Sequence, residues 1–122
     1  MRVVCNKLID AFGRATESSR RLRVGAEYVV LSFHCHPDRA IELLFDFGDG
    51  EISWWQSTAF TTVDVRHPPN WVTKINSMGT VETSPEPWLE QGFWNDFVDG
   101  AEGARAIYYA ERTVILASDS TP

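Results

Sequence analysis

Residues 27–57, EYVVLSFHCHPDRAIELLFDFGDGEISWWQS, decide the fold. Three segments within this stretch have the β-branched, aromatic and alternating composition of strands, at 27–35, 40–47 and 51–57. Pro37 and Asp38 are residues that favour a turn, and the GDG at 48–50 is typical of a tight hairpin. The stretch therefore predicts three consecutive antiparallel strands.

The first segment, 27–35, has the clearest strand pattern. Side chains alternate between the two faces of a strand. One face is then made of Tyr28, Val30, Ser32 and His34, and the other of Val29, Leu31, Phe33 and Cys35. We expect one continuous strand that ends at the turn beginning with Pro37.

Shorter segments extend the sheet in both directions. RVVCNKL, residues 2–8, is rich in β-branched residues and predicts a strand, although its apolar spacing also suits a helix. Residues 10–21 carry turn and charge signals and predict a long loop. Two more elements are expected after residue 57, a strand at 60–66 and a hairpin whose strands flank SMG at 77–79.

The pattern changes to helical spacing after Pro85. The first helix is indicated by Phe93, Trp94, Phe97 and Val98, and Gly100 supplies a stop signal. Asp99 and Glu102 are three residues apart, which suits a capping-box-like start of a second helix. The apolar side of that helix is expected to hold Ala104, Ile107, Tyr108 and Ile115.

Taken together, these elements predict an α+β fold. The expected architecture is a small antiparallel β-barrel or curled sheet with two C-terminal helices. We expect one domain over residues 1–122, with a β-barrel part at 1–84 and a helical part at 85–118 packed on it.

The amino-acid composition bears on disorder, membrane insertion and cellular location. The sequence has 122 residues, of which 43% are hydrophobic and 12% aromatic, so disorder is not expected. No apolar run approaches the roughly 20 residues that span a bilayer, and no signal peptide is recognised at the N-terminus. We therefore expect a cytoplasmic protein without a membrane partner, in which Cys5 and Cys35 are free thiols.

Charge is distributed unevenly along the chain. Residues 1–39 hold seven Lys and Arg against four Asp and Glu, a net charge of +3. Residues 40–122 hold four against thirteen, a net charge of −9. The acidic part repels nucleic acid and attracts cationic partners, so a nucleic-acid partner is not expected.

Histidines offer one candidate metal site. On a strand, His34 and His36 point to the same face and can present two imidazoles to one ion. Zinc requires at least a third ligand, and His67 is the only other histidine, while Asp38 offers a carboxylate from the turn. Pro37 indicates that the strand ends by His36, and the remaining ligands would have to come from elsewhere in the chain. We therefore favour a strand end with two exposed imidazoles, and no metal or cofactor is expected.

Acidic and aromatic residues offer a candidate protein-binding surface. Adjacent Trp54 and Trp55 must face opposite sides of a strand, so one of them is exposed unless the helices cover it. An exposed Trp beside carboxylates is typical of a binding hot spot. The candidate partner-binding residues are Asp46, Asp49, Glu51, Trp55, Asp96 and Asp99. No catalytic residues are assigned, because no nucleophile elbow, phosphate loop or EF-hand spacing is present.

Two stretches resemble a known class of proteins. RVVC followed by LRVGAEYVVLSF is similar to the opening of small bacterial and phage barrel proteins with an SH3-like fold. EPWLEQGFWNDFVDGAEGARAIYYAER resembles the tail of bacterial immunity proteins from contact-dependent growth inhibition loci. The resemblance covers most of the chain, but its motifs are structural, so no active-site residues are carried over.

The resemblance implies an SH3-like barrel that binds and neutralises a cognate bacterial toxin, for which a basic nuclease is one candidate. The acidic composition fits such a partner, because surfaces that hold phosphates are cationic. The alternative is a small-ligand or metal-binding β-barrel, with or without enzymatic activity, centred on His34, His36 and His67. A phage accessory barrel without a toxin partner is a third reading. The sequence does not define an oligomeric state.

Overall fold

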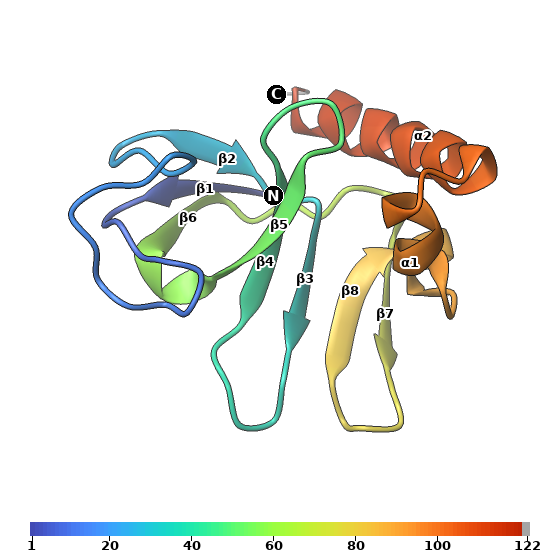
Figure 1. The fold of residues 1–122 in the computed structure, drawn as a ribbon, viewed down its shortest axis with the longest axis horizontal. Helices are drawn as coiled ribbons and strands as arrows, with labels where there is room; N and C mark the ends of the chain where they lie inside the picture. The colour runs from blue at the N-terminus through green and yellow to red at the C-terminus, as the bar shows by residue number, and fades with distance from the viewer. Residues whose placement is uncertain (121–122) are drawn as a thin grey trace.

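Eight strands precede two helices in the computed structural model, which describes residues 1–120 (Figure 1). The strands are β1 Arg2–Cys5, β2 Glu27–Val29, β3 Ser32–Cys35, β4 Glu42–Asp46, β5 Ile52–Gln56, β6 Phe60–Asp64, β7 Trp71–Ile75 and β8 Val81–Pro85. Two 3-10 turns, η1 Ser57–Ala59 and η2 Glu86–Leu89, precede the helices α1 Phe93–Val98 and α2 Glu102–Asp119. The predicted α+β class, both hairpins and both helices are confirmed.

The strands form two antiparallel sheets. The smaller sheet has the order β2-β1-β6 and the larger has the order β5-β4-β3-β8-β7. Within residues 1–120 these are two separate sheets and not a closed barrel, so the closed form of the predicted barrel is wrong. The SH3-like relationship stays a prediction.

The expected continuous strand at 27–35 is broken between the two sheets. The amide of Val30 donates to Met1 O in the smaller sheet at 3.0 Å, while the amide of Leu31 donates to Leu44 O in the larger sheet at 2.9 Å. Both side chains are fully buried, but Val30 belongs to a core cluster with Val3, and Leu31 to a cluster that includes the helices. The chain changes sheets here because two hydrophobic cores bury consecutive residues.

Strand β4 is covered on both faces. Leu43 and Phe45 face the core shared with β1, whereas Leu44 faces the core beneath the helices. The continuous apolar run ELLF is typical of a strand that is buried on both sides. We refer to residues 86–119 as the helical unit, and in Figure 1 this unit lies beside the larger sheet, with α2 along one end of it.

Only part of the predicted helical pattern is confirmed. Ala104, Tyr108 and Ile115 are buried against the sheet, but Ile107 is exposed because it is rotated away from that stripe. The predicted capping box is wrong, since Ala101 is the N-cap of α2 and no side chain caps it. Gly100 does end the first helical segment, with a φ of 81°.

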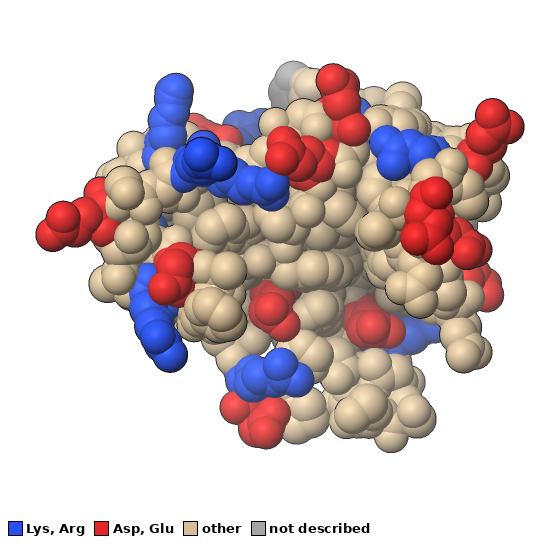
Figure 2. Space-filling view, in the orientation of Figure 1, with Lys and Arg blue, Asp and Glu red and all other residues tan. Residues whose placement is uncertain are grey.

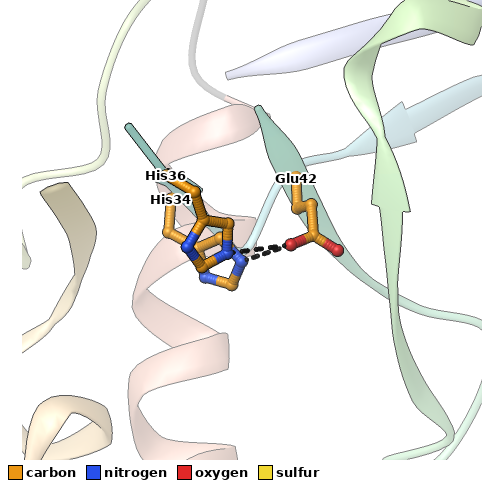
Figure 3. A group of neighbouring side chains, drawn as sticks. All are labelled: His34, His36 and Glu42. Carbon is orange, nitrogen blue, oxygen red and sulfur yellow. Dashed lines mark hydrogen bonds and ion pairs between the residues drawn. The ribbon is translucent and has the colours of Figure 1, made fainter. Parts of the chain in front are cut away.

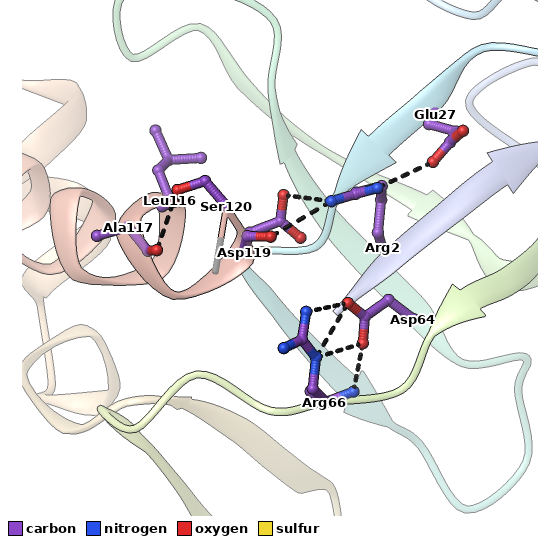
Figure 4. A network of polar contacts seen from close by, with 8 residues as sticks. All are labelled: Arg2, Glu27, Asp64, Arg66, Leu116, Ala117, Asp119 and Ser120. Carbon is purple, nitrogen blue, oxygen red and sulfur yellow. Dashed lines mark hydrogen bonds and ion pairs between the residues drawn. The ribbon is translucent and has the colours of Figure 1, made fainter. Parts of the chain in front are cut away.

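Arg2 joins the far end of α2 to the smaller sheet (Figure 4). Its guanidinium donates to the Asp119 carboxylate at 3.2 Å and to Glu27 on β2 at 3.3 Å. Nearby, Arg66 pairs with Asp64 at 2.7 Å. The Arg2 contacts connect the last turn of the helical unit to strands at the start of the chain.

The tip of the β4–β5 hairpin packs against the helical unit at Gly50. Gly50 has a φ of 83°, and a Cβ built there would lie 3.2 Å from Phe97 Cζ and 2.9 Å from Tyr109 Oη. We expect Gly50→Ala to lower the free energy of unfolding by about 2 kcal/mol, through both backbone strain and crowding. Gly25→Ala is the matched control, because its φ is 86° but no atom lies within 4 Å of the built Cβ. Equal losses in denaturant unfolding of the two variants would show that the crowding is unimportant.

Candidate functional site

Two groups of predicted partner-binding residues lie on one surface. Asp49 and Glu51 are exposed on the β4–β5 hairpin, and Asp96 and Asp99 are exposed at the end of α1. The two groups come together because Gly50 packs directly against side chains of the helical unit. Figure 2 shows acidic side chains over the hairpin and over the α1–α2 junction on the same side of the molecule. We call these four carboxylates the acidic face.

Two arginines lie at this face, Arg21 on the hairpin side and Arg105 between its two halves. From residue 75 to residue 104 the chain has six Asp and Glu and no Lys or Arg. Arg105 follows directly, and its guanidinium lies over the Phe97 ring at 4.7 Å, close to Gly50 on the hairpin. Arg21 forms a 2.7 Å ion pair with Glu51 on the hairpin side. Within residues 1–120, Glu51 is therefore the one carboxylate of the acidic face in an ion pair, and Asp96 and Asp99 form none.

Asp46 does not belong to this surface, although the sequence predicted it there. Its side chain is only 3% exposed. The carboxylate accepts hydrogen bonds from the amides of Gly48 and Gly50 and from the Tyr108 hydroxyl, and Arg112 Nε lies 3.4 Å away. Burial, followed by the hydrogen bond to Asp46, raises the pKa of Tyr108 well above its usual range. Asp46 therefore fixes the hairpin to α2 and is not available to a partner.

The two adjacent tryptophans face opposite sides of β5, as predicted, but neither is freely exposed. Trp55 packs on Phe47, and its indole donates to Ser53 Oγ at 2.8 Å. Trp54 packs on the other side, where its ring stacks on His34 with centroids 4.1 Å apart. The expectation of Trp55 as an exposed anchor is not met, because the core beside β4 half-buries it.

A pocket of about 300 Å³ lies where the larger sheet meets the helical unit. Three indoles line it together with carboxylates and small polar groups, from Ser32, His34, Trp54, Glu82, Ser84, Trp88, Leu89, Glu90 and Trp94. We call it the tryptophan pocket. Figure 2 shows a hollow between the sheet and the helical unit, with acidic side chains near it.

The sequence did not predict the tryptophan pocket, because three strands and the helical unit contribute its lining. Trp88 is buried, Trp94 is half-buried and Glu90 is exposed. The alternation of tryptophan and carboxylate in PWLEQGFW was the available signal. Aromatic faces beside carboxylates suit a cationic group.

His34 and His36 share one face of the chain, as predicted, and Glu42 meets them there (Figure 3). His34 Nε2 lies 2.9 Å and His36 Nε2 3.1 Å from Glu42 Oε1. His67 lies elsewhere, with its ring centroid 5.0 Å from that of Trp71 and 5.9 Å from that of Phe33. The prediction of His67 as a partner of this pair is wrong, because it follows β6 and packs beside β7.

Glu42 is the residue that the sequence did not reveal in this cluster. The pairing of β3 with β4 brings Glu42 there, because Glu42 lies directly opposite His34 in the two strands. Knowing this strand register would have revealed Glu42. Burial by itself would raise the pKa of Glu42, but the hydrogen bonds with His34 and His36 outweigh it and lower that pKa. The cluster therefore contains an ionised carboxylate at neutral pH.

Both cysteines are free thiols, as predicted. Cys5 is buried, and its burial raises the pKa of the thiol. A low-pKa nucleophile is therefore not found at Cys5.

No family model, curated protein or solved structure matches this chain. Among the described residues, no helix combines the length and the apolar character needed to cross a membrane.

Proposed function

We propose that this chain is an immunity protein that binds and neutralises a cognate bacterial toxin. The observation that carries the proposal is the packing of the β4–β5 hairpin on the helical unit. It assembles carboxylates from two distant segments into the acidic face. The similarity of the tail to immunity proteins supports the same function. An SH3-like relationship and a cytoplasmic location are parts of this proposal.

The acidic face would act on a basic toxin in two ways. Clustered carboxylates raise the rate of encounter with a cationic surface, an effect that salt weakens. Once bound, the carboxylates cover the positive groups with which a nuclease holds phosphates. Inhibition then needs no chemistry on the immunity protein, only a well-placed negative surface.

The tryptophan pocket would supply the anchor that the acidic face lacks. An Arg or Lys side chain of the toxin would enter this pocket, against the indoles that line it, and meet the exposed Glu90. Such buried contacts contribute most to the lifetime of a complex, whereas rim charges mainly affect association. The two features therefore predict different kinetic effects of substitution.

Charge reversal tests the acidic face. We expect Asp96→Lys with Asp99→Lys to weaken binding to the cognate toxin by at least about tenfold at low salt. The loss should lie mainly in the association rate and should shrink as salt is added. Surface plasmon resonance at several salt concentrations gives both quantities.

Glu17→Lys with Asp38→Lys is the matched control, because it changes the net charge equally at exposed positions outside the acidic face. Equal weakening by both pairs would mean that only net charge matters. The cognate toxin is sought among the genes directly upstream of this one. If no toxin is encoded there, or if the encoded toxin kills cells that co-express the wild-type chain, the proposed function is wrong.

A further inference from the structure

His34, His36 and Glu42 form a cluster at the end of the β3–β4 hairpin, apart from the acidic face (Figure 3). The strand register creates it, because His34 stands opposite Glu42 and His36 follows two residues later. One ligand atom from each residue lies within 4.8 Å of the other two. All three side chains are half-buried, so an ion from solution can reach them.

The distances in the cluster match those between ligands of one metal ion. Zinc bonds to imidazole nitrogen and carboxylate oxygen are about 2.0–2.2 Å long, which places neighbouring ligand atoms about 3 Å apart. The two imidazole nitrogens lie 2.9 and 3.1 Å from Glu42 Oε1. An ion can therefore replace these hydrogen bonds with little movement of either strand.

Neighbouring residues orient the two rings. Thr80 Oγ1 lies 3.0 Å from His36 Nδ1, and the threonine itself is buried. A hydroxyl accepts from Nδ1–H when the opposite nitrogen binds a metal, which is the arrangement that fixes many metal-bound histidines. On the other side, the Trp54 indole stacks on His34 with planes 25° apart. Ring orientation is thus set before an ion arrives.

We propose that His34, His36 and Glu42 form a binding site for a divalent transition metal, with zinc as the best fit. Two neutral imidazoles and one carboxylate are a known zinc set, in which a fourth position remains for water. The same nitrogen ligands disfavour magnesium, which prefers oxygen. His34 also lines the tryptophan pocket, so the ion would lie beside that pocket. The site does not depend on the proposed toxin partner.

Calorimetric titration of zinc into untagged, metal-free protein tests this site. We expect one zinc ion per chain, and at least tenfold weaker binding in both His36→Ala and Glu42→Gln. Thr80→Val should weaken binding by about tenfold, because it removes only the group that orients His36. His67→Ala and Cys35→Ala are the controls and should bind zinc as the wild type does. Magnesium should give no binding heat.

Zinc-induced shifts of the His34 and His36 imidazole resonances provide a second readout in the wild-type protein. These shifts show whether zinc binds to the two histidines even if His36→Ala fails to fold. Glu42→Gln is a second safeguard, because glutamine has nearly the same size as glutamate. The site is refuted if wild-type protein binds less than one zinc ion per chain. It is also refuted if Glu42→Gln binds normally, or if the His67 resonances shift in place of the other two.

Discussion

Replacing Trp88 with alanine is expected to lower the free energy of unfolding by about 4 kcal/mol. Trp88 is 1% exposed and lies in η2, between the larger sheet and α2. Its ring stacks on Tyr108 with centroids 5.2 Å apart and meets the edge of Trp94 at 5.5 Å. Alanine leaves a cavity that these rings can fill only in part. Denaturant unfolding followed by far-ultraviolet circular dichroism measures the loss.

Phe12→Ala is the control for this experiment. Phe12 is 77% exposed in the N-terminal loop, so its removal should change the free energy of unfolding by less than about 0.5 kcal/mol. A loss below about 1 kcal/mol for Trp88→Ala would show that the helical unit does not depend on this ring for its packing on the sheet.

Asp46→Asn is expected to lower the free energy of unfolding by about 3 kcal/mol. The buried carboxylate accepts from two hairpin amides and from Tyr108, and it faces Arg112. An amide has the same size, but its NH₂ group cannot accept any of these bonds, and the Arg112 guanidinium loses its counter-charge. Thermal and denaturant unfolding of the purified variant measure the effect.

Asp49→Asn provides a control within the same hairpin. Asp49 is exposed and has a φ of 49°, a conformation that asparagine also tolerates. Its free energy of unfolding should stay within about 0.5 kcal/mol of the wild-type value. Similar losses for both variants would mean that the hairpin responds to charge in general and that the burial of Asp46 is not the cause.

Local sequence patterns predicted most elements of the fold but not the way in which they meet. The run ELLF in β4 and the turn at Gly48–Gly50 are visible in the sequence because strand burial and turn geometry are local properties. The break between Val30 and Leu31 is not, since the alternation continues through it without Gly or Pro. Only the presence of two cores, one for each side chain, makes the chain change sheets there.

The sequence predicted those parts of the candidate sites that depend on the spacing of residues within one strand. The shared face of His34 and His36 follows from strand geometry, whereas Glu42 requires the register of a neighbouring strand. Asp46 and Asp49 are both aspartates of the same hairpin, so the sequence does not distinguish them. They differ because α2 packs on Asp46 and buries it, whereas Asp49 stays exposed. The tryptophan pocket forms between the sheet and the helical unit, so no single segment could predict it.

The change of sheets at Val30 and Leu31 has a consequence for how the molecule opens. Two consecutive amides carry the hydrogen bonds of different sheets, and a peptide unit is too short and stiff to absorb any relative displacement of them. Fluctuations that displace one sheet relative to the other must therefore break at least one of these two bonds and disturb the core on that side. We therefore expect the unfolding of the two sheets to be coupled through this peptide unit, so that opening of one sheet lowers the hydrogen-exchange protection of the other.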